Sequence, residues 1–216
     1  MRKVPFAKNE IYHIFNRGTD KREIFSCDYD YARFIRSLDE FNQIEPVYSL
    51  YLNDLRKSRG LLDVQRLRKG RKLVEIITYC LNPNHFHLML NQLEVGGISE
   101  FMKRIGGGYT KYYNSRYERS GALFQGKFKS THVDSNELLL YLSVYVNANH
   151  QIHGYPEKDW PYCSLLDYTG KRDGKLCDKK IILGQFNNNF GEYEKYLNDN
   201  VMYFKEKKEM EKYILE

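Results

Sequence analysis

Two histidines, two positions apart, are the first residues of this chain whose spacing could do chemistry. His85 and His87 flank Phe86 in a stretch where polar and apolar residues alternate, a pattern typical of a β-strand. Residues two apart on a strand point to the same side, about 6.5–7 Å apart along it. Two neutral imidazoles so placed can bind one metal ion. Two half-exposed histidines without a ligand are the commoner meaning of His-x-His, so the motif needs support from elsewhere in the chain.

A second set of reactive side chains follows in residues 138–150. Tyr141, Tyr145 and Asn149 are spaced four apart, so on a helix they share one face. A tyrosine hydroxyl can form a covalent intermediate, although its usual pKa of about 10 means that something must activate it. A carboxamide oxygen suits a hard cation such as magnesium or manganese. Because the chain has 19 tyrosines, the same spacing also fits tyrosines that only line the edge of a core.

Positive charge is concentrated in two windows. The chain has 34 basic and 28 acidic residues, a net charge of +6. Residues 56–72 hold eight basic residues and one acid, and residues 101–130 hold seven and one. In the second window tyrosine and phenylalanine alternate with lysine and arginine. Basic side chains neutralise phosphates and aromatic rings stack on unpaired bases. Residues 101–130 therefore fit a nucleic-acid surface or, equally, a solvated helix with an apolar underside, and residues 56–72 either bind a polyanion or form a mobile loop.

These residues must be positioned by a mixed set of elements. Strands are predicted at residues 11–16, 47–52, 73–81, 85–90 and 124–133. Helices are predicted at 28–41, 99–119 and 134–149, with Asp28 and Asp134 or Ser135 as N-caps. The turn 82–84 makes a hairpin of the strands on either side. This order predicts an α+β fold, an antiparallel sheet with helices packed on one face.

The chain is expected to divide at about residue 169. Residues 1–169 form the main domain, with a basic insertion at about 53–72, and residues 170–216 form a linker and a C-terminal amphipathic helix. No apolar run approaches the ~20 residues of a membrane span, and the first residues lack the apolar stretch of a secretion signal. The four cysteines are far apart in sequence, which indicates reduced thiols. We expect a cytoplasmic protein with no membrane partner and no small-molecule substrate.

Several stretches in the same order together resemble the HUH-type tyrosine transposases, in particular the REP-associated branch and its single-strand insertion-sequence relatives. The resemblance covers roughly residues 8–168. It is carried by His13-Ile-Phe-Asn-Arg-Gly18 with Ile24-Phe25 and Asp30-Tyr31, by Pro83-Asn84-His85-Phe86-His87-Leu88, by Tyr109-Thr-Lys-Tyr-Tyr-Asn114 with residues 121–130, and by Tyr145-Val-Asn-Ala-Asn149. His150 stands where the family usually has a proline, and the 53–72 insertion has no match.

The resemblance implies a ferredoxin-like sheet and a defined chemistry. His85 and His87, with Asn149 as third ligand, would hold a divalent metal, magnesium or manganese. Tyr145 would attack a DNA phosphodiester, giving a 5′-phosphotyrosine link and a free 3′-hydroxyl. Tyr141 is the rival nucleophile, and Tyr145 is preferred because it stands four residues before Asn149. The partner would be single-stranded or hairpin DNA, with the protein nucleoid-associated when bound, as a monomer or homodimer.

The predicted function is metal-dependent single-strand cleavage and strand transfer, that is, a transposase. One alternative is a catalytically silent regulator that binds hairpin DNA or RNA, and a weaker one is a metal-dependent nuclease that uses water. The predicted nucleic-acid-binding residues are basic or aromatic side chains of the charged windows and of the first strand: Arg17, Arg66, Arg68, Lys69, Arg71, Lys103, Arg104, Lys111, Tyr112, Arg116, Lys127 and Lys129.

Overall fold

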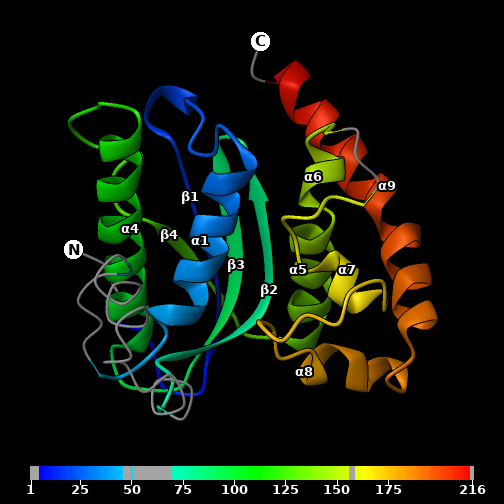
Figure 1. The fold of residues 1–216 in the computed structure, drawn as a ribbon. Coiled ribbons are helices and arrows are strands. Elements are labelled where there is room, and N and C mark those ends of the chain that lie inside the picture. Colours follow the sequence, from blue (N-terminus) through cyan, green and yellow to red (C-terminus); the bar gives the residue numbers. More distant parts are fainter. Residues whose placement is uncertain (1–4, 46–49, 51–69, 156–158, 215–216) are drawn as a thin grey trace.

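A four-stranded antiparallel sheet organises the chain. The computed structural model describes residues 5–45, 50, 70–155 and 159–214. Its strands are β1 (Ile11–Arg17), β2 (Val74–Asn82), β3 (His85–Gln92) and β4 (Lys129–Val133), in the order β2-β3-β1-β4 (Figure 1). The predicted α+β class with an antiparallel sheet is confirmed. The β2–β3 hairpin is also present, and β3 lies inside the sheet between β2 and β1.

One face of the sheet is covered by helices α1 (Asp28–Glu40) and α4 (Gly97–Arg116). Phe34 of α1 packs on Phe86 of β3, with ring centroids 5.2 Å apart. Tyr109 of α4 is fully buried in the same layer and donates from its hydroxyl to the carbonyl of Ile24 at 2.6 Å. These two helices match the ferredoxin-like arrangement that the sequence predicted.

Helices cover the opposite face as well, a detail in which the structure differs from the prediction. Helices α5 (Asn136–Asn147) and α6 (Asn149–Ile152) lie there (Figure 1). The physical reason is that β2 is buried at almost every position, so both of its faces need cover. Within β3, Phe86 faces α1 while His87 faces α5.

The remaining described helices lie beyond α5. They are α7 (Leu165–Tyr168), α8 (Lys180–Leu183) and α9 (Phe190–Ile214), with the 3₁₀ turn η2 (Gly184–Phe186) between α8 and α9. Another 3₁₀ turn, η1 (Thr19–Lys21), follows β1. Helix α9 packs along α5, where Asn147 donates to the hydroxyl of Tyr193 at 2.8 Å (Figure 1). Among the described residues, no helix is both long and apolar enough to cross a membrane.

Several predicted boundaries shift. The strand predicted at 124–133 is shorter, because Gly126 adopts a φ of +68° and residues 124–128 form a loop before β4. Helix α1 is capped at Cys27 rather than Asp28, without a side-chain cap bond. The predicted strand at 47–52 lies outside the described residues except for Leu50, which is helical. Most of the 53–72 insertion also lies outside them.

The segment that carries Tyr145 and Asn149 is two helices rather than one. Ser135 caps α5 by accepting a hydrogen bond from the Leu138 amide at 3.2 Å. Helix α5 ends at Asn147, and after Ala148 the chain is helical again from Asn149 to Ile152. A proline at 150 would lack the amide hydrogen and restrict the residue before it; His150 imposes neither constraint, and the short second helix forms.

Candidate active site

The two histidines of β3 are joined by a third histidine from β1. In the β1–β3 register, Phe15 pairs with His87 and His13 pairs with Met89, which makes His13 and His87 diagonal neighbours on one face. His13 Nε2 lies 2.8 Å from His87 Nδ1, and both side chains are buried. The predicted metal-binding strand therefore presents His87 with one ring nitrogen already engaged.

The hydrogen bonds of His85 define which of its nitrogens is available. Its Nδ1 lies 2.6 Å from the amide oxygen of Asn84, which can only accept, so Nδ1 carries the proton. Its Nε2 therefore has the lone pair. That lone pair accepts from Asn82 Nδ2 at 2.9 Å and lies 3.1 Å from the Asn149 amide oxygen. The structure thus brings His85 and Asn149 together, although 64 residues separate them.

This donor set fits a divalent cation. The Asn82 amide donates to the Asn149 oxygen at 2.6 Å as well as to His85, so two lone pairs converge on one hydrogen-bond donor. A cation in the position of the Asn82 amide nitrogen would meet the same two lone pairs, those of His85 Nε2 and the Asn149 amide oxygen. The Asn149 amide nitrogen is buried with no hydrogen-bond partner among the described residues. Within that same part of the chain, no group of three or more His, Cys, Asp or Glu is arranged to hold a metal, so a site here depends on the Asn149 carboxamide.

Tyr145 lies against the histidines, and Tyr141 does not. The Tyr145 ring stands edge-on to His87, with centroids 5.4 Å apart, and to His13 at 6.0 Å. Phe204 of α9 packs on Tyr145 at 5.4 Å. One turn earlier on α5, Tyr141 packs on Phe204 at 4.5 Å and on Tyr203 at 6.5 Å. The preference for Tyr145 therefore agrees with its place beside the candidate ligands.

These side chains line a cavity of about 410 Å³ with a basic rim. His85, His87 and Tyr145 form part of its wall, together with His153, whose ring lies 4.5 Å from that of His85. The basic residues that line it are Arg17, Lys21 and Lys129. The cavity therefore combines candidate metal ligands, a phenol and cations, as a site for a phosphodiester requires.

Burial keeps the two inner histidines neutral. It lowers the pKa of His13 to about 4. Burial also lowers the pKa of His87 well below its usual value, and the neighbouring histidines His13, His85 and His153 act in the same direction. Since a metal binds the neutral imidazole, His87 is in the form that a cation needs across the physiological pH range.

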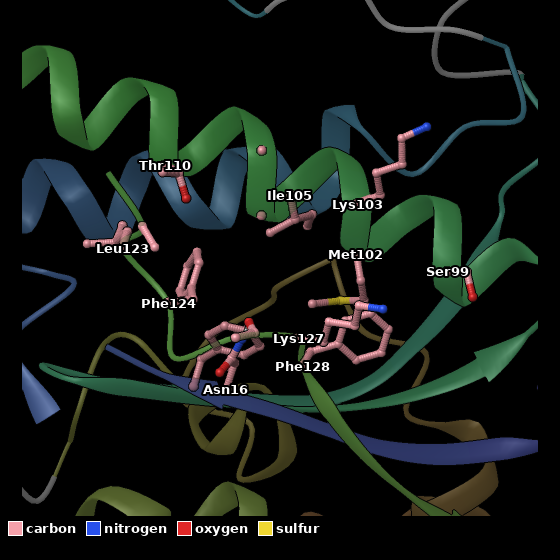
Figure 2. Close-up of a pocket in the computed structure, with 15 residues that line it drawn as sticks. Asn16, Ser99, Met102, Lys103, Ile105, Thr110, Leu123, Phe124, Lys127 and Phe128 are labelled. Atoms are coloured by element: carbon pink, nitrogen blue, oxygen red, sulfur yellow. Dashed lines mark hydrogen bonds between the residues drawn. The ribbon is translucent and has the colours of Figure 1, made fainter. Parts of the chain in front are cut away.

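A second, larger cavity of about 760 Å³ lies between α4 and the loop that precedes β4 (Figure 2). Its walls are apolar side chains, Phe86, Met102, Ile105, Leu123, Phe124 and Phe128. Lys103 and Lys127 line it as well, and Gly106 and Gly107 leave it open on the α4 side. Asn16, near the end of β1, lines both cavities. The groove contains Phe86 and the Tyr145 site contains His87, and these two side chains lie on opposite faces of β3.

The other predicted nucleic-acid-binding residues fall into two groups. Lys111 is exposed on α4, and Arg71 is exposed with an ion pair to Glu94 at 3.7 Å. In contrast, Arg104 is mostly buried and donates to backbone carbonyls of residues 41–45, while the Tyr112 hydroxyl donates to buried Asp30. Arg116 lies 3.7 Å from Asp30 and over the Tyr29 ring. Arg66, Arg68 and Lys69 lie outside the described residues.

Sequence reasoning assigned no site role to several residues that the structure brings to the candidate site. They are His13, Lys21, Asn82, His153 and Tyr155. The alternation of β1 does place His13 and Phe15 on one face, but which face that is depends on the register with β3. The local sequence places Asn82 in a turn. Its contact with His85 lies within the β2–β3 hairpin, and its contact with Asn149 arises only when α6 packs on the sheet.

Comparison with known proteins supports the resemblance drawn from the motifs. Residues 58–149 match the family model described as "Transposase IS200 like". A solved structure of a REP-associated tyrosine transposase bound to a REP hairpin is similar in fold, with a TM-score of 0.51 and 14% identity over 82% of this chain and 93% of that one. A second solved structure, of a provisionally assigned transposase from Deinococcus radiodurans R1, has a TM-score of 0.34 and 15% identity over 68% of this chain and 95% of that one. A search of curated proteins gave no match.

The resemblance to the IS200-like transposases is therefore confirmed over residues 58–149, and the fold of the chain is similar to that of the REP-associated tyrosine transposase. The family match spans the histidine strand and the helix with Tyr145 and ends at Asn149. It supports a transposase role for the chain.

Proposed function

We propose that this protein cleaves and rejoins single-stranded DNA through a covalent tyrosine intermediate, with Tyr145 as the nucleophile. A divalent cation, magnesium or manganese, would be held by His85, His87 and Asn149. The observation that carries the proposal is the meeting of Tyr145 with His87 at 5.4 Å between ring centroids, in one cavity with His85. Spacing in the sequence alone left both the histidines and the tyrosine with commoner structural explanations.

The proposed reaction exchanges one phosphoester for another. The Tyr145 hydroxyl oxygen forms a bond to the phosphorus, the bond from phosphorus to the 3′-oxygen breaks, and the phenolic proton is balanced by the proton that the 3′-hydroxyl gains. A bound cation would neutralise charge on the non-bridging oxygens. Because the tyrosyl phosphodiester keeps the energy of the broken bond, attack by a 3′-hydroxyl can reverse the step and join a strand.

The residues of the rim and groove would hold the strand. Arg17, Lys21 and Lys129 line the same cavity as Tyr145, and their positive charges would neutralise phosphates there. The apolar groove offers the faces of Phe124 and Phe128 to unpaired bases, with Lys103 and Lys127 for their phosphates. A duplex would present stacked bases without free faces, so this arrangement favours unpaired nucleotides, as at the foot or loop of a hairpin.

A single chain suffices for the proposed site. The two histidines, Asn149 and Tyr145 meet without a residue from a second copy, which favours a monomer as the active form over a homodimer that exchanges helices. The hairpin substrate is proposed here by analogy with the similar structure, which is described as bound to a REP hairpin. A cytoplasmic location, nucleoid-associated when bound, belongs to the same proposal.

The test is a search for the covalent adduct. The protein is incubated with labelled single-stranded hairpin DNA from the flanks of its own gene, with magnesium or manganese, and analysed on a denaturing gel. Wild type and Tyr141→Phe are expected to give a protein–DNA band, and Tyr145→Phe none. An adduct that persists in Tyr145→Phe would show that the nucleophile is another residue, and cleavage without any adduct would favour a nuclease that uses water.

One observation favours a second candidate, a silent regulator that only binds hairpins. The Asn82 amide donates to both His85 Nε2 and the Asn149 amide oxygen, so each of these acceptors has a hydrogen-bond partner when no cation is bound. This candidate predicts equal hairpin affinity for wild type and the His85→Ala/His87→Ala double variant, with no adduct from either. An adduct from wild type alone excludes it.

A further inference from the structure

His13 contacts a candidate metal ligand but is not among the described residues that line the cavity. Its Nε2 lies 2.8 Å from His87 Nδ1, so one of these two nitrogens carries a hydrogen and donates the hydrogen bond, and the other accepts it. If His13 donates, neutral His87 must have its own proton on Nε2, and that nitrogen cannot bind a cation. If His87 donates, its Nε2 keeps a lone pair.

We propose that His13 is a positioning residue that holds His87 in the Nδ1–H form, so that Nε2 of His87 is free for a divalent cation. The inference rests on the proposed function, since it concerns how that metal ligand is prepared. His13 would contact neither the cation nor the DNA and would act only through its hydrogen bond with His87. In other metal sites the partner that accepts from the second nitrogen of a histidine ligand is a carboxylate or carbonyl, and here it is an imidazole.

The surroundings of the pair hold both rings in place. The planes of the two imidazole rings are inclined by only 13° to each other, and the ring centroids are 5.1 Å apart. Phe15 packs on His13 at 5.0 Å and on His87 at 5.6 Å. Both histidines are buried, so few waters compete for the bond between them. His13 also stands edge-on to Tyr145 at 6.0 Å, which links the orientation of the ligand to that of the nucleophile.

His85 shows the same arrangement with an unambiguous acceptor. The amide oxygen of Asn84 accepts from His85 Nδ1 at 2.6 Å, while the Asn84 amide nitrogen donates to the carbonyl of Lys21 at 3.2 Å. His85 therefore presents Nε2 toward Asn149. With His13 accepting from His87 Nδ1, both histidines of the motif would present the same nitrogen, each fixed by a neighbour on its other side.

The first test reads the tautomer directly and needs neither metal nor DNA. In full-length protein with ¹⁵N-labelled histidine and EDTA, the nitrogen chemical shifts of His87 are expected to show a protonated Nδ1 and an unprotonated Nε2. In His13→Phe, which keeps a ring but removes the acceptor, the Nε2–H form of His87 should appear. A wild-type His87 protonated on Nε2 would overturn the proposal.

The second test measures manganese affinity without DNA. His13→Phe is expected to bind Mn²⁺ about 10–100-fold more weakly than wild type, the usual cost of removing such a partner. His13→Gln, which restores an acceptor oxygen, should recover most of the affinity. His132→Gln, at an exposed histidine of β4 bonded to Glu10, is the matched control and should bind as wild type.

The outcomes separate this proposal from the proposed function. Equal Mn²⁺ affinity in folded His13→Phe and wild type would overturn the positioning role even if the adduct forms. Correct tautomer and Mn²⁺ results without any adduct would support the positioning role while the proposed DNA cleavage fails. Thermal unfolding of each variant shows whether lost affinity is only lost folding, and rescue by His13→Gln excludes that explanation.

Discussion

The ring of Tyr145 stands perpendicular to the ring of His87, at 89° and with centroids 5.4 Å apart. This contact joins α5 to β3, one of the two interior strands of the sheet, within one chain. The contact also distinguishes Tyr145 from Tyr141. Both rings pack on Phe204 of α9, but the second ring neighbour of Tyr141 is Tyr203 of α9 and not a histidine of the sheet. Tyr145, the candidate nucleophile chosen for its spacing from Asn149, thus lies beside the candidate ligand His87. Each prediction below tests one part of this arrangement.

Removing the Asn149 carboxamide should weaken metal binding. Asn149→Ala deletes the oxygen that faces His85 Nε2 at 3.1 Å, and we expect Mn²⁺ affinity to fall about tenfold or more, because a site with two imidazoles alone lacks a third ligand. Asn149→Asp, which supplies a carboxylate, should bind at least as well as wild type. Calorimetric titration measures both.

The control for this series is Asn136→Ala, at an exposed asparagine of the preceding helix, α5, bonded to Gln185. It should leave Mn²⁺ affinity unchanged. If Asn149→Ala, while folded, binds Mn²⁺ as tightly as wild type, Asn149 is not a ligand.

The stability of the metal-free protein should fall as the pH falls from about 6.5 to 4. The pKa of His13 is lowered by burial to about 4 from its usual 6.5. The unfolded state therefore takes up the proton first, and the stability present above pH 6.5 is lost as the pH drops toward 4. For His13 the loss is about 3 kcal/mol, and the lowered pKa of His87 acts in the same direction.

Urea unfolding in EDTA at several pH values measures this loss. His13→Phe should flatten the dependence of the unfolding free energy on pH between 4 and 6.5, and exposed His132→Gln should not. A dependence as steep in His13→Phe as in wild type would show that His13 does not contribute.

Much of the fold was predictable because it depends on local patterns. The alternation around His85 and Phe86 gave the correct strand, and helical periodicity gave α1 and α4 to within a few residues despite the three glycines 106–108. The strand predicted at 124–133 was too long because a left-handed glycine, Gly126, interrupts an otherwise strand-like pattern. Propensity does not reveal such an interruption when the flanking residues are aromatic and basic.

The candidate site was predictable only in part. Its reactive residue types were visible, but the contact of His13 with His87 depends on strand register, and that of Asn82 with Asn149 depends on the packing of α6. No local pattern encodes either. The hydrogen bonds of Arg104 and Tyr112 could not be predicted either. Both residues stay predicted nucleic-acid contacts, and within the fold their side chains are bonded to backbone carbonyls and to Asp30, because a charge or hydroxyl on a helix can also serve its neighbours.

The cavity rim should contribute to DNA binding through charge. Replacing Arg17, Lys21 and Lys129 by glutamine should weaken binding of single-stranded DNA and flatten its salt dependence, by about 0.7 in log–log slope for each phosphate that the protein no longer neutralises. Fluorescence anisotropy over a range of salt measures this. The matched control replaces Lys175, Lys180 and Lys195, three exposed lysines away from the cavity, and should leave the slope nearly unchanged.

The basic window 56–72 is predicted to contact DNA as well. Neutralising Arg66, Arg68, Lys69 and Arg71 should weaken hairpin binding and flatten its salt dependence. Of these, Arg71 lies within the described residues, exposed beside Glu94. An unchanged salt slope in the fourfold variant would mean that the window is only a solvated segment.

The groove between α4 and the loop before β4 allows a test that separates binding from stability. Gly107 is among the residues that line the groove, and a Cβ built there meets nothing within 4 Å. Gly107→Ala should therefore stabilise the protein by about 0.5–1 kcal/mol, because glycine is costly inside a helix. The larger Gly107→Leu should leave the fold intact while filling the space proposed for unpaired bases, and single-stranded DNA should bind several-fold more weakly.

Gly108, the next residue of α4, is the contrasting position. A Cβ there would lie 2.8 Å from the Phe41 ring, so Gly108→Ala should gain less stability than Gly107→Ala or lose some, without touching the groove. Thermal unfolding and DNA anisotropy on the three variants give the comparison. If Gly107→Leu is folded and binds single-stranded DNA as wild type does, the groove holds no bases, and the strand must leave the Tyr145 cavity over another surface.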